Sequence, residues 1–188
     1  MKKAAFCAYL PIALAAIVLL WAAASYNALL RSDQAVKQQW AQVENQLQRR
    51  SDLIPNYVRV VQGYAKHERE TLENVIKARS ACMSATGPAE TAKAENFLSQ
   101  TLKSLFAVVE AYPDLKANQN FMALQEELTS TENKVSFARQ FYNDTVMRYN
   151  TKIQTVPSNI IAGMFSFKAE EFFEVEAPAE RQAPKVQF

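Results

Sequence analysis

Hydrophobic residues recur every three or four positions along most of the chain that follows residue 31. The first stripe lies in the region 31–84 and comprises Val36, Trp40, Val43, Leu47, Ile54, Val58, Val61, Ala65, Leu72 and Val75. This spacing is typical of one face of an α-helix, so the pattern predicts a single long helix over about residues 31–84.

Pro55 lies inside this helix, yet the apolar phase continues across it, since Leu47, Ile54 and Val61 are spaced by seven residues. A proline removes the hydrogen bond to the carbonyl four residues earlier, here that of Ser51, and crowds that carbonyl. Ile54 is a poor N-cap, so a new helix is not expected to begin here. The sequence therefore predicts a helix kink at Pro55 rather than a break.

Two shorter stripes predict two further helices. Gly87-Pro88 is a strong turn signal, and the second helix is expected over about 89–112, before Pro113-Asp114. The third is expected over about 117–155. Helices joined by short connections pack as antiparallel neighbours. The predicted fold is all-α: an elongated antiparallel helical bundle with long, coiled-coil-like helices over about residues 31–155.

The segment 1–30 is a predicted membrane anchor. After Lys2 and Lys3 no charge occurs until Arg31, and about 20 apolar residues suffice for a transmembrane helix. A cleaved signal peptide is the alternative, because the three alanines at 22–24 resemble a cleavage site. The apolar run exceeds the roughly 7–15 residues typical of signal peptides, which favours the uncleaved anchor. By a narrow margin, the flanking positive charges favour a cytoplasmic N-terminus and a bulk outside the cytoplasm.

The expected helices have unequal lengths. At about 1.5 Å per residue, the first soluble helix would measure roughly 75 Å and the second about 36 Å. The second helix would then cover only the part of the first that follows Pro55. The stripe from Val36 to Leu47, which includes Trp40, would lack a partner within the chain. We expect it to self-associate beside the membrane, giving a homo-oligomer, or to be covered by the C-terminal segment.

Polar residues interrupt the stripes at or near inward positions: Arg50, Glu68 and Arg79 in the first helix, and Thr131, Glu132 and Asn133 in the third. Buried polar groups must pair, and an arginine–glutamate pair inside a bundle fixes register more than it adds stability. The alternative is a polar cleft that binds a ligand. We favour the register interpretation, because interior polar residues in helical bundles are well attested in that role.

The third helix carries two Tyr-Asn pairs one heptad apart, Tyr142-Asn143 and Tyr149-Asn150, which therefore share a face. Tyrosine combines a large apolar body with a hydroxyl that needs a partner. We expect a core seam with satisfied hydroxyls. The alternative is a partner surface, to which Trp40 would contribute.

The chain after residue 155 divides in two. The first part, 156–174, carries the apolar residues Ile160, Ile161, Met164, Phe165, Phe167, Phe172 and Phe173. We expect it to dock on the bundle, with insertion into the membrane interface as the alternative. The second part, 175–188, is rich in alanine, proline and glutamate and is expected to be a flexible tail. It ends in Val186-Gln187-Phe188, an apolar C-terminus of the kind that PDZ-type domains capture.

Three stretches carry a family resemblance: RRSDLIPNYVRVVQGYAKHE, YPDLKANQNFMALQEELTSTENKVSFARQFYNDTVMRYNTKI and PSNIIAGMFSFKAEEFF. They resemble the LemA family of bacterial membrane proteins, over nearly the whole chain. The resemblance implies a single N-terminal helix in the bacterial cytoplasmic membrane, an α-helical bundle-like domain and no established enzymatic activity. The family often has a glycine between two aromatic residues where this chain has Phe165-Ser166-Phe167, which leaves a tight turn there without its usual glycine.

Composition and motifs argue against several function classes. The net charge is +2 with both signs mixed along the chain, so there is no basic stripe of the kind that nucleic-acid binders carry. The one histidine, His67, lacks the second histidine of an H-E-x-x-H zinc motif, and no Walker-type glycine loop or G-x-S-x-G motif occurs. Cys7 and Cys82 lie in different segments and give no disulfide framework. We expect no enzyme, no metal and no cofactor.

Two functions remain open. The first is a membrane-anchored, non-enzymatic interaction or scaffold protein that self-associates and docks partners through its helix faces or tail. The second is a membrane-tethered ligand sensor or adaptor with a polar pocket in the bundle core. We favour the first.

Overall fold

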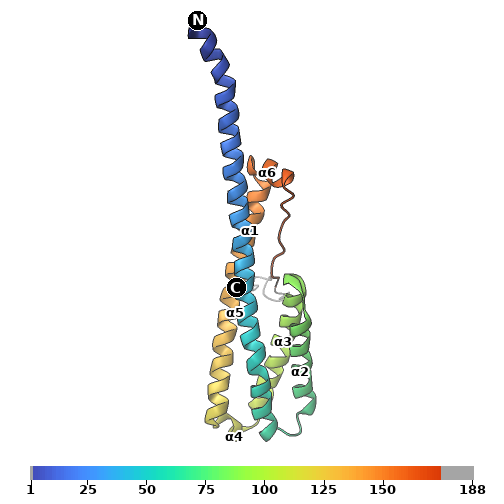
Figure 1. Cartoon of the computed structure of the whole chain (residues 1–188). Coiled ribbons are helices and arrows are strands. Elements are labelled where there is room, and N and C mark those ends of the chain that lie inside the picture. Colours follow the sequence, from blue (N-terminus) through green and yellow to red (C-terminus); the bar gives the residue numbers. More distant parts are fainter. Residues whose placement is uncertain (1, 175–188) are drawn as a thin grey trace, which may run out of the picture. The chain divides into compact units, whose positions relative to one another are not determined.

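The computed structural model describes residues 2–174, and side chains from residue 11 onward; this part of the chain contains six helices and no strand (Figure 1). The helices are α1 (Lys2–Tyr64), α2 (Arg69–Ser84), α3 (Gly87–Val109), α4 (Pro113–Lys116), α5 (Gln119–Gln154) and α6 (Ser158–Met164). The prediction of an all-α helical bundle is confirmed.

The helices pack into two compact units. The first unit comprises the described residues up to 40 together with 143–170, and the second comprises 41–142 together with the described residues from 171 onward. Both α1 and α5 are long enough to contribute to each unit.

The single helix expected over 31–84 is wrong, because α1 ends at Tyr64 and α2 begins at Arg69. Ala65 is fully buried in the turn, and its amide still donates to the Val61 carbonyl at 2.8 Å. The turn contains no proline, and the apolar spacing continues through it, so periodicity alone did not reveal it. Folding back lets α2 bury Leu72 and Val75 in the same core as α1.

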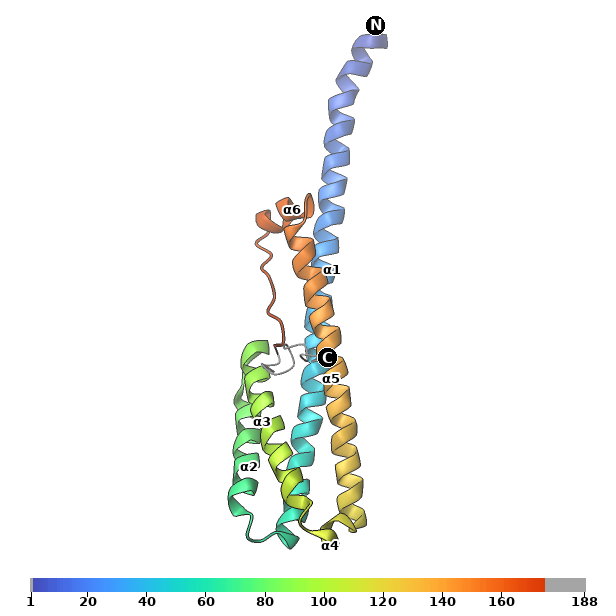
Figure 2. The same ribbon diagram turned by 180° about the vertical axis from the view of Figure 1, so that it is seen from behind.

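The second unit is therefore a four-helix bundle rather than the expected three. Its long members are residues 41–64 of α1, α2, α3 and residues 119–142 of α5, and α2 and α3 lie side by side in both views (Figures 1 and 2). The core includes an aromatic cluster in which the Tyr57 ring lies 5.7 Å from Phe106 and 5.1 Å from Phe121. The second helix, expected over 89–112, and the third, over 117–155, match α3 and α5 closely at their ends.

Short polar side chains fix where these helices begin. The Glu90 carboxylate accepts hydrogen bonds from the backbone amide and the hydroxyl of Thr86, at 3.2 and 3.1 Å. The Asn118 side-chain oxygen accepts from the Phe121 amide at 3.1 Å, which satisfies one of the orphan donors at the start of α5.

The apolar stripe expected to lack a partner is covered within the chain. Val36 is 3%, Val43 0% and Leu47 8% exposed. The expectation failed because only the short second helix was counted as a cover. In the first unit, however, α5 also lies along α1, since the Lys152 ammonium donates to the Ala28 carbonyl at 2.7 Å and to the Ser32 hydroxyl at 3.0 Å.

The first unit has its own small apolar core, which α6 completes. Ile161 and Ala162 of α6 pack with Leu29 of α1, and Tyr26 and Phe167 lie at the edge of this cluster. The described apolar residues of α1 contain an 18-residue window with a mean hydropathy of 1.9, so α1 is long and apolar enough to cross a membrane.

The tight turn after α6 forms without glycine. Ser166 adopts a φ of 57°, and the Phe167 amide donates to the Ala162 carbonyl at 3.0 Å. This is the bond of a Schellman cap, in which a left-handed residue follows the helix end. A serine occupies that strained position here.

Candidate functional site

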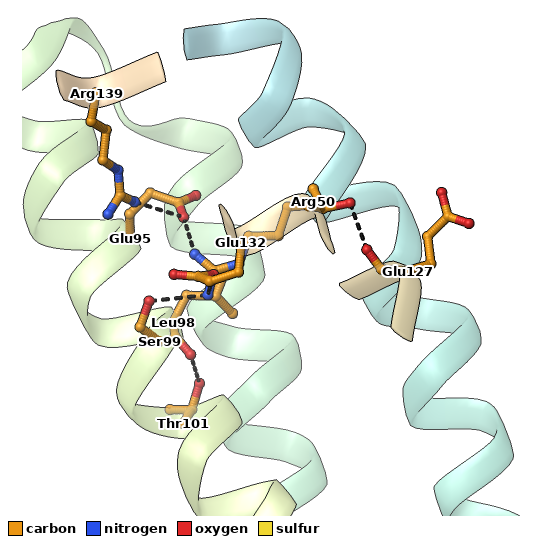
Figure 3. Close-up of polar contacts among 9 residues, drawn as sticks. Arg50, Glu95, Leu98, Ser99, Thr101, Glu127, Glu132 and Arg139 are labelled. Carbon is orange, nitrogen blue, oxygen red and sulfur yellow. Dashed lines mark hydrogen bonds and ion pairs between the residues drawn. The ribbon is translucent and has the colours of Figure 1, made fainter. Parts of the chain in front are cut away.

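A cluster of paired charges lies inside the second unit. Arg50 of α1 is 2% exposed, and its guanidinium donates to the Glu95 carboxylate of α3 at 2.7 Å and to the Ser99 hydroxyl at 3.0 Å. It also forms an ion pair with Glu132 of α5 at 2.7 Å (Figure 3). Arg50 therefore ties three helices together through one side chain.

A second arginine completes the cluster. The guanidinium of Arg139 on α5 lies 3.6 Å from the Glu95 carboxylate and covers the Phe173 ring, with 4.7 Å between the guanidinium carbon and the ring centroid. Burial lowers the pKa of Arg139 from its usual value, and the Glu95 charge opposes that shift. Two arginines and two glutamates balance, so Arg50, Glu95, Glu132 and Arg139, which we call the charge cluster, carry no net charge.

Arg79 supplies a hydrogen bond in place of the one that Pro55 removes from α1. Because Pro55 has no amide hydrogen, the Ser51 carbonyl loses its partner within α1. The Arg79 Nε of α2 donates to that carbonyl at 2.7 Å. The helix α1 continues through Pro55, which is therefore not a break; the kink stays a prediction.

Cys82 lies beside the charge cluster but is not built to react. Burial, and after it the nearby Glu95 carboxylate, raises the pKa of the Cys82 thiol far above its ordinary value. The thiol is therefore protonated at neutral pH, whereas nucleophilic cysteines need the thiolate.

Two cavities adjoin the cluster. One of about 380 Å³ is lined by Glu44, Gln48, Ser51, Cys82, Thr91 and Glu95 among others. The other, of about 220 Å³, is lined by the polar residues Arg50, Glu132 and Ser99 and by the apolar residues Leu102, Phe106 and Leu128, among others. Within the described residues, Ser51 Oγ and Arg50 Nε are buried and make no hydrogen bond. These atoms are donors or acceptors that a ligand or water can use.

The other predicted polar residues lie outside the cluster. Glu68 sits in the turn between α1 and α2 and accepts a hydrogen bond from the Tyr112 hydroxyl at 3.3 Å. Thr131 is 1% exposed, but its hydroxyl donates to the Glu127 carbonyl of its own helix at 2.8 Å. Asn133 is exposed. Of the six predicted residues, the structure brings together only Arg50 and Glu132.

Sequence reasoning missed Glu95, Ser99 and Arg139. For Glu95 the signal was present, because it lies three residues before Leu98 and continues the stripe of Leu102 and Leu105. A glutamate in phase with buried leucines requires a cationic partner. For Arg139 the signal was also present, because it lies four residues after the buried Val135 and three before the buried Tyr142. Ser99 has the same spacing between Glu95 and Leu102, but a small hydroxyl does not indicate a charged partner.

The Tyr-Asn pairs form a packed seam. Tyr142 and Tyr149 are each 1% exposed, and their hydroxyls donate to the carbonyls of Glu171 at 2.8 Å and Lys168 at 2.9 Å, respectively. The Asn150 amide group bonds both the amide and the carbonyl of Glu170, at 2.9 and 2.8 Å. A partner surface made of these tyrosines does not fit, because the chain's own segment 168–171 covers them.

Of the remaining candidate residues, two lie within the described part of the chain and two lie outside it. Trp40 and Asn143 are half-buried, and each makes a contact within the protein. Val186 and Phe188, proposed for C-terminal recognition, lie outside the described residues. No group of three histidine, cysteine or acidic residues is placed to hold a metal among the side chains that the structure describes.

Comparison with known proteins points to one family. A sequence model of the LemA family matches residues 39–188. Magnetosome protein MamQ 2 of Paramagnetospirillum magneticum is 24% identical over 180 residues, covering 82% of this chain and 66% of the relative. Protein LemA of Metamycoplasma hominis is 25% identical over 140 residues, covering 72% of this chain and 63% of the relative. The chain thus spans just under two thirds of the length of these curated relatives.

Proposed function

The chain belongs to the LemA family, and on that premise we propose that it is a membrane-anchored, non-enzymatic interaction protein that binds further copies of itself. The observation that carries the proposal is a pair of outward phenylalanines. Phe137 and Phe141, one turn apart on α5, are each 62% exposed. The charged residues of the core, by contrast, pair with one another and leave no evident reactive group.

The position of these phenylalanines suits a twofold pairing of two copies. Because α5 runs antiparallel to α1, two copies anchored in one membrane hold their α5 helices in the same direction. If these two parallel helices meet, Phe137 and Phe141 of one copy contact the same residues of the second copy. An isologous interface needs a self-complementary surface of this kind. Partner proteins would then bind an assembly rather than a single chain.

Oligomeric mass in mild detergent tests this proposal on the full-length chain. We expect a dimer or a multiple of it, and we expect Phe137→Glu to shift the mass to the monomer. Met83→Glu on α2, which alters another exposed apolar residue, is the matched control and should leave the mass unchanged.

A second charged substitution sharpens the test. Phe141→Glu should shift the mass to the monomer as Phe137→Glu does, because both rings would lie in the same interface. A monomeric full-length protein at all concentrations, or a dimer indifferent to both single changes, would remove the proposed interface.

We place the anchor in the bacterial cytoplasmic membrane with the bulk of the chain outside the cytoplasm. The support is the apolar segment of α1 and the lysines that precede it. Two reporters, fused in turn to the C-terminus, test the orientation. Alkaline phosphatase should be active there, because it works only outside the cytoplasm. An inactive phosphatase together with an active cytoplasmic reporter would reverse the orientation.

The second candidate, a ligand sensor, is favoured by the 220 Å³ cavity beside Arg50. Its apolar walls suit a short hydrocarbon chain, and the unbonded Arg50 Nε suits an anionic group, as in a short-chain carboxylate. A ligand that binds only the folded protein raises the melting temperature. Short-chain carboxylates should do so in the parent and less in Leu128→Trp, which fills the cavity; no shift at saturating concentration would count against a sensor.

A further inference from the structure

Helix α6 has one face that is buried against α1 and another that is exposed. Ile161 and Ala162 are buried against α1, at 4% and 3% exposure. The other face carries Ile160 at 57% and Met164 at 72% exposure, followed by Phe165 at 55%. Large apolar side chains this exposed and this close together mark an interaction surface.

The position of α6 along α1 suggests what covers this face. The uncharged run of α1 between Lys3 and Arg31 would be about 40 Å long at about 1.5 Å per residue. A bilayer has a hydrocarbon core of about 30 Å and measures about 40–45 Å with its headgroup layers. The last turns before Arg31 therefore fall in the interfacial layer.

Helix α6 packs on those turns. Its cluster includes Ala22, Tyr26 and Leu29 of α1, and the Phe165 ring centroid lies 4.7 Å from that of Tyr26. The exposed face of α6 consequently sits at the depth where acyl chains meet headgroups. Tyr26, five residues before Arg31, matches the aromatic belt typical of that depth.

Basic residues mark the polar side of this layer. The Lys152 ammonium is held at the Ala28 carbonyl and the Ser32 hydroxyl, at 2.7 and 3.0 Å. Arg31 and Lys168 are exposed in the same unit. Lysine and arginine side chains at this depth extend toward lipid headgroups.

We propose that α6 is an interfacial membrane helix, which inserts Ile160, Met164 and Phe165 into the same bilayer that α1 crosses. A helix of seven residues would bind a membrane weakly by itself. Because α1 tethers it there, the second contact is intramolecular and needs little affinity. The two contacts together restrict rotation of the first unit about the α1 axis. The proposal rests on the membrane anchoring in the proposed function, but not on self-association.

Brominated lipids test the proposal in the full-length protein, reconstituted in nanodiscs of phosphatidylcholine and phosphatidylglycerol. In a Trp21→Phe, Trp40→Phe background, Met164→Trp should show blue-shifted fluorescence that lipids brominated near the headgroup quench. Phe137→Trp in the same background is the matched control in the second unit and should not be quenched by lipid.

The native Trp21, kept alone in a Trp40→Phe variant, separates two kinds of failure. If Trp21 is quenched and Met164→Trp is not, the interfacial helix is wrong and the anchor stands. If neither is quenched, the membrane anchor fails as well. Blue-shifted but unquenched Met164→Trp fluorescence that depends on protein concentration would assign the face to a second protein copy and overturn the proposal.

A charge at the same face gives a second readout. Met164→Glu changes an exposed position and should leave thermal stability in detergent unaltered, while it increases hydrogen exchange over 158–167 in nanodiscs. Gln154→Glu, exposed and of equal charge change at the end of α5, should not increase it. Equal exchange in the two variants would contradict the proposal.

Discussion

The two units use polar side chains in different ways. In the second unit, Arg50 bonds to the side chains of Glu95 and Glu132 on two other helices. In the first unit, Tyr149 and Asn150 bond instead to the backbone of residues 168–170. Side chain to side chain pairs between helices specify which helix faces meet. Side chain to backbone bonds allow a segment without secondary structure to lie against a helix, because they satisfy its backbone groups.

The largest effect should come from breaking the charge cluster. Arg50→Met leaves Glu95 buried beside only Arg139, and removing one partner of a buried pair costs about 3–5 kcal/mol. Urea unfolding measures the free energy of unfolding. The double variant Arg50→Met with Glu95→Met should recover only part of the loss, because Arg139, whose side chain is 11% exposed, then loses its Glu95 partner. If the double variant had as low a free energy of unfolding as Arg50→Met alone, the cluster would add stability in addition to fixing the register of the helices.

Two bonds within the second unit are exceptions because they link a side chain to backbone: that of Tyr142 to the Glu171 carbonyl and that of Arg79 to the Ser51 carbonyl. Arg79→Met should cost about 1–3 kcal/mol in the free energy of unfolding, since it leaves a half-buried carbonyl without a donor. Pro55→Ala restores an amide donor four residues after Ser51. In that background Arg79→Met should cost clearly less, which a double-mutant cycle measures. Equal costs in both backgrounds would mean that Arg79 acts through packing rather than through this carbonyl.

In the first unit, Asn150→Ala tests the backbone-directed bonds. It removes both bonds to Glu170, and we expect a loss of about 1–3 kcal/mol that is mostly local. Hydrogen exchange should rise over residues 168–171, with little change in α3. Gln154→Ala on the same helix is exposed and should change neither region. A loss of global stability without a rise in hydrogen exchange over residues 168–171 would contradict the proposal that these side chain to backbone bonds act locally in the first unit.

The sequence predicted the helices well where apolar spacing and turn residues agreed. Gly87 and Pro113 marked the turns before α3 and α4, and the structure begins helices at both. The turn between α1 and α2 was missed because Ala65 and Leu72 keep the helical phase through it, and only tertiary packing makes the chain fold back. Arg50 and Glu132 were found as polar interruptions of apolar stripes. Arg139 also follows the apolar phase of α5 and could have been found in the same way. Which partners Ser99 and Arg139 contact depends on how the helices approach one another, which no single-helix pattern contains.

The smallest effect concerns an exposed ion pair in the second unit, which offers a contrast with the buried cluster. Arg49 donates a hydrogen bond to Glu127, and this bond lowers the pKa of the Glu127 carboxyl below its usual 4.5. Because the folded-state pKa is the lower one, the pair stabilises the protein above the unfolded-state pKa. That contribution is lost as pH falls through the folded-state pKa. Stability should therefore decline with acid in this window slightly less steeply in Glu127→Gln than in the parent.

Salt separates this surface pair from the cluster. The Arg49 and Glu127 side chains are 52% and 44% exposed, so about 1 M salt, with a Debye length of about 3 Å, should screen their attraction. The difference between the parent and Glu127→Gln should then vanish. The cost of Arg50→Met should persist in the same salt, because Arg50 and Glu95 are each 2% exposed and their charges are shielded from mobile ions. If salt reduced both costs equally, the interior of the second unit would have to admit ions and water, and the pairing of Arg50 would be no more buried than that of Arg49.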